Sequence, residues 1–291
     1  MSGVSFNGEM RAIVLVTASS MPKPDQESHL LVTALERRGV RALLLAWDAE
    51  FDWSSVDLVV VRSTWDYVER LDEFLSWADA VESVTRLVNP AAVLRWNTHK
   101  RYLTELIERR VPTVPTVVVE KGSVLPDLSA LFPGSLELVV KPAVSIGAIG
   151  AMRAAADDAG LAAHLGHVAS SGDVLVQPFV RSVLDRGERS LLFAGLDLSH
   201  SVRKVPLAGE CRVQDHHGGS VHPHRATAGE LAVARAALAA APARCTYARV
   251  DLVDTGDGPV VMELELVEPA LFLNEDPSAS GRFAASIISE L

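Results

Sequence analysis

The sequence has few cysteines, no long apolar run and no excess of basic residues. Its two cysteines, Cys211 and Cys245, are too few for a disulfide framework and predict a cytoplasmic protein with reduced thiols. No apolar run approaches the ~20 residues of a membrane span, and residues 1–9 lack the basic start and apolar core of a signal peptide. A formal charge of −10 argues against a nucleic-acid partner, because phosphate backbones bind basic surfaces. A nucleotide is not excluded, since it needs only a local cluster of cations.

The chain is long enough for a substantial core and more than one domain. Of its 291 residues, 48% are hydrophobic and 22% charged, as is usual for a folded protein. The pattern divides into three segments, for which we expect an N-terminal α/β domain, a small central subdomain and a C-terminal subdomain: residues 10–97, 98–172 and 173–291.

The first segment alternates short apolar runs with helical patterns. It predicts a parallel sheet with strands at 13–17, 42–46 and 58–61 and helices at 27–38 and 69–83. Ligands of such sheets gather at the carboxyl ends of the strands. The third strand runs directly into residues that we expect to contact a ligand: Arg62, Ser63, Thr64, Trp65, Asp66 and Tyr67. Either aromatic residue, taken alone, could equally cap the core.

The other two segments predict further strands and a few helices. The second opens with a helix at 98–110, followed by strands at 114–119 and 138–142. The third is mostly strands, interrupted and closed by helices. Its strands are expected at 174–177, 190–196, 201–205, 247–253 and 260–266, and its helices at 227–241 and 277–291.

Three carboxylates fall in apolar strands of the third segment. Glu263 and Glu265 share a face, because side chains in a strand alternate with period two. Asp251, in the preceding apolar run, could pair beside them. Three carboxylates so packed would repel unless a cation lay between them, and Mg²⁺ takes such oxygen ligands. The alternative is an amphipathic hairpin with some of these residues in solvent.

Lys141 ends an apolar strand before a loop that contains Gly147 and Gly150. Backbone N–H groups of such a loop can surround phosphate oxygens, with the lysine supplying charge. The loop does not match the Walker A pattern, and an ordinary turn with a solvated lysine remains open. Further on, the strand before Phe179 offers a backbone edge for adenine, and Asp185 could hold ribose hydroxyls. A plain core strand is equally consistent.

Basic and histidine side chains are frequent in the third segment. Four cations lie in or beside the predicted strands of this segment: Arg189, Arg203, Lys204 and Arg212. If they lie near the carboxylates, they would suit a polyphosphate and an anionic substrate. The alternative is that they are ordinary surface charges. Four histidines follow in a Gly-rich turn, where no cysteine pair or HxxxH helix supports a zinc site. We interpret these histidines as loop residues: His216, His217, His222 and His224.

The order of these elements resembles the ATP-grasp superfamily. The series begins with two lysines, Lys100 and Lys141, and a Gly-rich flap. A Gln-Pro-Phe-Val segment at 177–180 follows, then the arginines and carboxylates. The resemblance covers nearly the whole chain from Met10 and is closest to the branch of glutathione synthetase and the ribosomal-protein glutamate ligases. Within that branch, residues 212–219 and 262–269 look like the D-cycloserine-forming enzymes.

The resemblance implies a fold and a set of roles. The fold would be α/β, with a parallel pre-ATP-grasp domain followed by two α+β subdomains that clasp ATP. Mg²⁺ would bind Asp251, Glu263 and Glu265, and Arg212, Lys141 and Arg203 would be catalytic. ATP would contact Lys100, Lys141, Ser145, Gln177, Pro178, Phe179, Val180, Asp185 and Arg189. The substrate would contact Arg62, Ser63, Thr64, Trp65, Asp66 and Glu268.

The family implies a carboxylate–amine ligase. ATP would phosphorylate the carboxylate of a small amino-acid-like substrate, and an amine would displace phosphate to form an amide. Ring closure within one molecule is a variant that the D-cycloserine resemblance suggests. A silent ATP-binding regulator and a small-molecule kinase are the alternatives. Relatives are often dimers, so a homodimer is one expected state.

Overall fold

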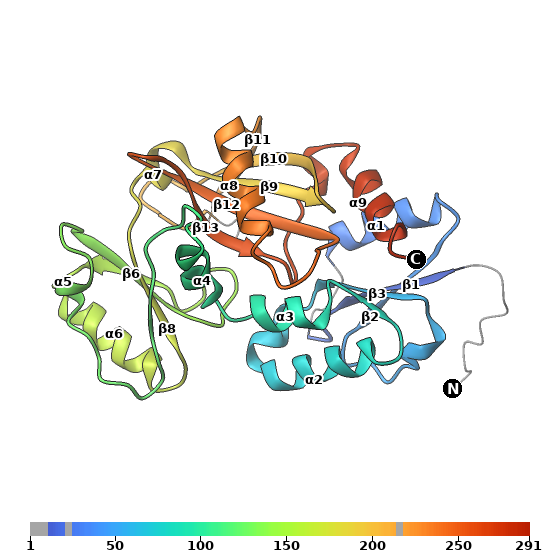
Figure 1. The fold of residues 1–291 in the computed structure, drawn as a ribbon, viewed down its shortest axis with the longest axis horizontal. Helices are drawn as coiled ribbons and strands as arrows, with labels where there is room; N and C mark the ends of the chain where they lie inside the picture. Colours follow the sequence, from blue (N-terminus) through green and yellow to red (C-terminus); the bar gives the residue numbers. More distant parts are fainter. Residues whose placement is uncertain (1–10, 21–24, 214–217) are drawn as a thin grey trace.

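The computed structural model describes residues 11–20, 25–213 and 218–291, which form three sheets with helices packed around them (Figure 1). The first sheet has the order β2-β1-β3-β4, and all its neighbours are parallel. Its strands are β1 (Ala12–Thr17), β2 (Arg41–Ala46), β3 (Leu58–Ser63) and β4 (Arg86–Val88). The sheet confirms the parallel α/β arrangement predicted for the first segment. It also contains β4, a short strand that the pattern did not predict.

Helices cover both faces of this first sheet. On one face, α1 (Gln26–Glu36) packs beside α9 (Ala279–Ile288), so the chain's C-terminal helix completes the core of the N-terminal segment. On the other face lies α2 (Leu71–Glu82), whose Phe74 and Ala78 are fully buried. After β3 the chain forms a single 3₁₀ turn, Trp65–Glu69, which fixes the polar hexapeptide at the carboxyl end of the sheet.

The second sheet is antiparallel, with the order β5-β8-β6-β7. Its strands are β5 (Val117–Val119), β6 (Glu137–Pro142), β7 (Met152–Ala155) and β8 (Val174–Pro178), with α5 (Leu128–Leu131) and α6 (Ala159–Ala169) beside them. Because β8 pairs with β5 and β6, we propose that the boundary between the second and third segments follows β8 rather than preceding it.

The third sheet, with the order β11-β10-β9-β12-β13, is antiparallel and holds the candidate site. Its strands are β9 (Glu188–Ala194), β10 (Asp197–Val205), β11 (Ser220–His224), β12 (Tyr247–Thr255) and β13 (Gly258–Glu265). Around it lie α3 (Ala91–Asn97), α4 (Tyr102–Glu108), α7 (Ser182–Arg186) and α8 (Ala228–Leu238). The helix predicted at 98–110 is shorter, because residues 98–101 form turns between α3 and α4.

No helix in the described ranges is long and apolar enough to cross a membrane.

Candidate active site

Charged residues gather on one face of the third sheet, which we call the front face. Strand alternation brings them there from four neighbouring strands: Glu188 and Ser190 on β9, Lys204 on β10, Arg249 and Asp251 on β12, and Glu263 and Glu265 on β13. The register pairs Asp251 with Glu263 and Arg249 with Glu265. The alternation of side chains along each strand thus places the three predicted carboxylates on a common face, next to cations.

Asp251 lies at the centre of the front face and is 2% exposed. Its Oδ2 atom lies 3.0 Å from Lys204 Nζ and 2.9 Å from Arg249 Nη2, and the Ser190 hydroxyl donates to its Oδ1 atom at 2.6 Å. Burial alone would raise the pKa of this carboxyl, but the positive charges of Arg249 and Lys204 outweigh burial and hold the pKa well below its usual range. Asp251 is therefore a carboxylate, and both cations stay fixed beside it.

Two lysines from other elements reach the same carboxylates. The Lys100 ammonium lies 3.0 Å from Glu263 Oε1 and also donates to the carbonyl of Ser145. Lys141 is the penultimate residue of β6, and burial lowers the pKa of its ammonium, against the attraction of Glu263. The structure thus brings the two predicted lysines and the loop carbonyl of Ser145 to the edge of the front face.

The loop after Lys141 contains two glycines, and the structure constrains Gly150 most strongly. Gly150 has a φ of +74°, and a Cβ atom there would lie 2.9 Å from Pro142 Cγ. A larger residue would therefore be strained and would push against the strand end that carries Lys141. The tight loop keeps the backbone close to the site.

The carboxylates are paired with cations and do not form a ready metal cluster. No three Asp, Glu, His or Cys side chains within the described ranges lie close enough to hold a metal ion. Glu263 pairs with Lys100, Asp251 with Lys204 and Arg249, and Glu265 with Arg249. As donors, however, three carboxylates on neighbouring strands are the hard oxygen ligands that suit Mg²⁺.

Two predicted arginines lie on the opposite face of the sheet. Arg189 follows Glu188 and precedes Ser190, so its side chain points away from Asp251 and pairs with Glu230 and Asp254. Arg203 precedes Lys204 and is paired with Arg189 in register. The structure therefore does not bring the predicted ATP contact Arg189 or the predicted catalytic residue Arg203 to the front face. Lys204 stands there instead.

Arg212 is also separate from the front face in this structure. Its guanidinium donates to Glu210 at 2.6 Å within the same loop, and no contact in the described ranges joins it to Asp251. His216 and His217 lie outside the described residues. His222 accepts or donates at Ser220, and His224 contacts Glu230 on the opposite face. Among the described residues, neither His222 nor His224 contacts Asp251, Glu263 or Glu265.

The segment predicted to hold adenine adjoins an apolar cluster beside Glu263. Val180 and Met262 pack there with the buried residues Val114, Val183, Val213 and Val253. The Gln177 amide donates to Thr116 Oγ1 at 2.9 Å, and the Phe179 N–H donates to the Glu137 carbonyl at 2.9 Å. Pro178 ends β8, and Asp185 is exposed on α7. The cluster supplies apolar walls, whereas the backbone N–H of Phe179 is already paired.

A cavity of about 270 Å³ next to the front face is lined by three residues of the polar hexapeptide after β3, namely Arg62, Ser63 and Trp65. The Arg62 guanidinium donates to the Pro269 carbonyl at 3.2 Å and lies 3.6 Å from Glu27. Trp65 Nε1 donates to the carbonyl of Glu268 at 3.3 Å. The segment at 62–67 and the segment that begins at Glu268, both expected to contact the substrate, thus meet here, and their contact with a substrate stays a prediction. Asp66 instead accepts from Trp47 Nε1 at 2.9 Å and does not line the cavity.

Several buried polar atoms at this cavity have no partner. Arg62 is 2% exposed, and its Nε and Nη1 atoms make no hydrogen bond. The same holds for the buried hydroxyl of Ser63, which also lines the cavity, and for the buried hydroxyl of its neighbour Thr64. Unsatisfied buried donors cost free energy, so their retention points to a ligand that supplies acceptors. A carboxylate fits the planar guanidinium.

Burial raises the pKa of Glu268 to about 7, although the Lys100 charge and the Tyr67 hydroxyl oppose the shift. The folded protein therefore holds this proton more tightly than the unfolded chain. The resulting stabilisation is present below the ordinary pKa of 4.5 and is lost as pH rises through about 7. This side chain therefore changes its charge near neutral pH, directly before Pro269, which lines the cavity.

We predict that Glu268→Gln flattens the pH dependence of stability. From about pH 5 to about pH 8 the wild-type free energy of unfolding should fall by about 2 kcal/mol relative to that of the variant. Urea denaturation across this range measures the difference. Glu69→Gln, at an exposed position, is the matched control and should follow the wild type. Parallel curves for the wild type and Glu268→Gln would contradict the assignment.

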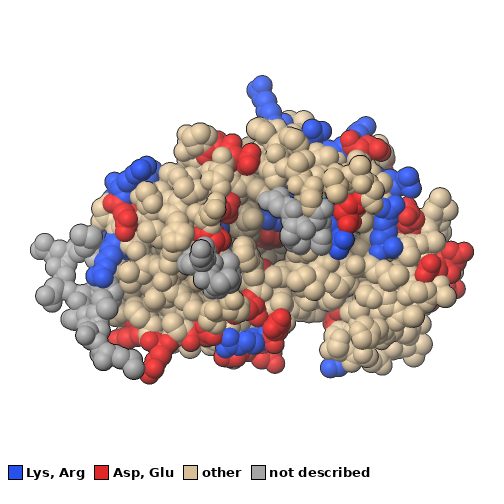
Figure 2. Space-filling view, turned by 180° about the vertical axis from the view of Figure 1, so that it is seen from behind, with Lys and Arg blue, Asp and Glu red and all other residues tan. Residues whose placement is uncertain are grey.

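Figure 2 shows a hollow near the middle of one face, with acidic and basic side chains at its rim. Carboxylates, lysines, an apolar cluster and an unfilled cavity adjoin one another around the front face. Such an arrangement can bind a polyphosphate next to a small anionic molecule.

Comparisons with known proteins identify the family. Residues 106–254 match the model of the prokaryotic glutathione synthetase ATP-grasp domain, and residues 13–89 match the N-terminal domain of D-cycloserine synthetase DcsG. The cycloserine biosynthesis protein DcsG of Streptomyces lavendulae is 35% identical over 306 aligned positions, which cover 97% of this chain and 99% of that protein. The chain belongs to the ATP-grasp family.

Solved structures agree with this assignment. A crystal structure of D-cycloserine synthetase DcsG has a TM-score of 0.84 at 33% identity, with 96% of this chain and 100% of that chain covered. D-alanine–D-alanine ligase from Bacillus anthracis has a TM-score of 0.74 at 16% identity over 97% of each chain, which shows the shared fold alone. The predicted ATP-grasp fold and the enzyme class, an ATP-dependent ligase, are thereby confirmed.

Two residues of this front face received no predicted role, Glu188 and Arg249, whereas Lys204 was expected only as one of four cations near the carboxylates. A signal was present, because Arg249 lies two residues before Asp251 and therefore shares its face. The position of Lys204 could not be read in this way, since it depends on the pairing of β10 with β9 and of β9 with β12.

Proposed function

We propose that this ATP-grasp enzyme joins a carboxylate to an amine by way of an acyl phosphate. The observation that supports this most directly is the cavity lined by Arg62, whose Nε and Nη1 atoms have no partner, beside a front face rich in cations. Arg249 links the two, because it donates both to Asp251 and to the carbonyl of Ala270, which lines the cavity. A small amino-acid-like substrate fits there, and its bond to the amine forms an amide or a cyclic amide.

The roles of the front-face residues follow from their charges. Lys100 and Lys141 would bind the ATP phosphates, and Lys204 and Arg249 would stabilise charge on the transferring phosphoryl group. Asp251, Glu263 and Glu265 would hold Mg²⁺, which when bound neutralises phosphate oxygens. The apolar cluster around Val180 and Met262 would receive adenine. Catalysis is then positioning and charge neutralisation, with no protein nucleophile.

The reaction has two steps, each of which forms one bond and breaks another. A carboxylate oxygen of the substrate attacks the γ-phosphorus, and the bond to ADP breaks. The amine then attacks the acyl carbon, phosphate leaves and the amine loses a proton. Both steps need a site from which water is excluded, and Arg62, Lys204 and Asp251 are already buried in the protein.

The proposal is tested by ADP and phosphate release from Mg-ATP in the presence of pools of amino acids and small carboxylates. We expect release that depends on one pool, yields an amide and disappears in Lys141→Ala. A stable phosphorylated product without an amide would instead indicate a kinase. ATP binding with no release from any pool would favour a silent nucleotide-binding protein, and either outcome would contradict a ligase.

We further predict that Arg62→Gln raises the KM for the carboxylate substrate by roughly 10- to 100-fold and changes kcat much less. A charge-assisted hydrogen bond contributes about 1.5–3 kcal/mol, which corresponds to that loss of binding. Steady-state kinetics measure the split between KM and kcat. Arg86→Gln, an exposed arginine outside the cavity, is the control. An unchanged KM in Arg62→Gln would show that Arg62 does not contact the substrate.

A further inference from the structure

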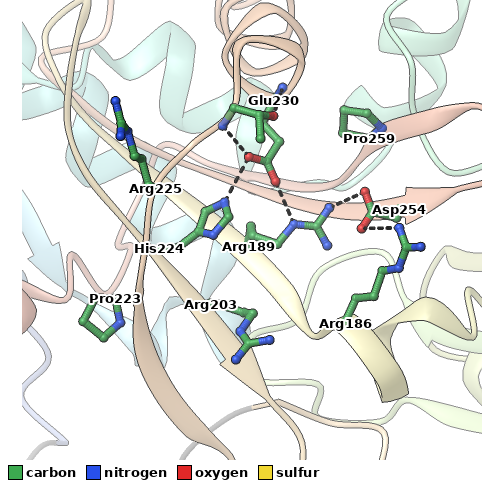
Figure 3. Close-up of a pocket in the computed structure, with 10 residues that line it drawn as sticks. Arg186, Arg189, Arg203, Pro223, His224, Arg225, Glu230, Asp254 and Pro259 are labelled. Carbon is green, nitrogen blue, oxygen red and sulfur yellow. Dashed lines mark hydrogen bonds and ion pairs between the residues drawn. The ribbon is translucent and has the colours of Figure 1, made fainter.

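A second cavity lies on the back face of the third sheet, opposite Asp251. Its volume is about 470 Å³ (Figure 3). We call it the arginine pocket, and it is lined by Arg186, Arg189, Arg203, Pro223, His224, Arg225, Thr227, Glu230, Asp254 and Pro259. Four arginines face two carboxylates here, although the whole chain carries a formal charge of −10. The local charge is thus opposite in sign to that of the protein.

The two carboxylates of the arginine pocket are already neutralised. Arg189, which is 3% exposed, lies between them, with Nε 2.9 Å from Glu230 and Nη2 2.7 Å from Asp254 (Figure 3). Glu230 also accepts from the Thr227 N–H at 2.8 Å and contacts His224 at 3.0 Å. Burial opposes ionisation, but these bonds outweigh it and lower the pKa of Glu230 to about 2. Glu230 and Asp254 are thus held in fixed positions at the floor of the arginine pocket.

Two cations remain over this floor. Arg203 and Arg225 are both exposed, and neither makes an ion pair or side-chain hydrogen bond with any residue that the structure describes. They line the pocket from β10 and from the residue that follows β11. Thr227 caps α8 here, so the positive end of that helix dipole also faces the pocket. The pocket thus keeps positive charge that its own acids do not cancel.

We propose that the arginine pocket binds a small phosphate-bearing molecule at a site separate from the front face. Guanidinium groups bind phosphate oxygens in bidentate fashion. A cavity of about 470 Å³ has room for a diphosphate or a phosphorylated small molecule.

The pocket shares its strands with the front face. Arg189 lies between Glu188 and Ser190 on β9, and Arg203 precedes Lys204 on β10. A ligand held by Arg203 therefore binds the same backbone that positions Lys204 beside Asp251. Occupancy of the arginine pocket is in this way linked to the geometry of the front face, independently of which reaction proceeds there.

Calorimetric titration with inorganic diphosphate tests the proposal. The variants are Arg225→Gln, the double variant Arg203→Gln/Arg225→Gln, and the control Arg235→Gln, which removes an exposed arginine of α8 outside the pocket. Any binding to front-face cations is common to all four proteins and cancels in the comparison. Both pocket positions are exposed, so the variants should fold.

We expect the wild type and Arg235→Gln to bind diphosphate alike. Arg225→Gln should lose a part of the affinity, and the double variant should bind at the pocket roughly 10-fold more weakly or not at all, since charge-assisted hydrogen bonds are removed. Coincident isotherms for the wild type and the double variant would overturn the proposal, as would an equal loss in Arg235→Gln.

Discussion

Lys204→Met is expected to lower kcat by ~10²–10³-fold, the usual effect of removing one preorganised charge from a reacting centre. Lys204 is buried, and its ammonium lies 3.0 Å from Asp251 and contacts Glu188. On the proposed mechanism it stabilises the phosphoryl group in transfer, a role that the shorter and uncharged methionine cannot fill. ADP release at saturating Mg-ATP measures the loss.

The fold should survive this substitution. Asp251 keeps Arg249 and Ser190 as partners. Burial already raises the pKa of Glu188 to about 7, against the attraction of Lys204, so without the lysine Glu188 would take up a proton and become neutral. Lys121→Met, at an exposed position, controls for loss of a lysine and should leave kcat unchanged. A fully active Lys204→Met would remove Lys204 from the reaction.

Asp251→Asn is expected to affect both turnover and stability. The substitution leaves Lys204 and Arg249 buried without their central counter-charge, and breaking a buried ion pair from one side costs about 3–5 kcal/mol. It also removes one of the three carboxylates proposed for Mg²⁺, so turnover should fall by ~10²-fold or more. Urea denaturation and ADP release measure the two effects separately.

The control for this variant is Asp197→Asn, an exposed carboxylate at the start of β10. It should change the free energy of unfolding by less than about 0.5 kcal/mol. If Asp251→Asn were as stable as the wild type, the buried ion pairs around Asp251 would not have the importance that the structure assigns to them.

Local patterns in the sequence predicted the fold and part of the site. Alternation with period two placed Glu263 and Glu265 on one face, and the strand–helix order of the first segment predicted its parallel sheet. The hexapeptide after β3 reached a cavity because the carboxyl ends of parallel strands meet at one edge. These inferences needed only neighbouring residues.

The positions of the other site residues depend on which distant strands pair and in which register. Arg189 and Ser190 are adjacent in sequence but point to opposite faces, and the face of each depends on the register of β9 with β12. A sequence pattern locates a strand to within a few residues, which is too coarse to settle that alternation. The position of Glu27, which accepts from the N–H groups of Leu271 and Leu273, depends likewise on contacts between distant segments.

The central claim is that a substrate carboxylate is phosphorylated at the front face. The most direct test uses the amino acid that supports ADP release, labelled in both carboxylate oxygens with a heavy oxygen isotope. The account predicts that one labelled oxygen appears in each inorganic phosphate released, because that oxygen bonds to the γ-phosphorus and leaves with it. Phosphate without the label, formed at the same rate, would show that no acyl phosphate forms and would contradict the account.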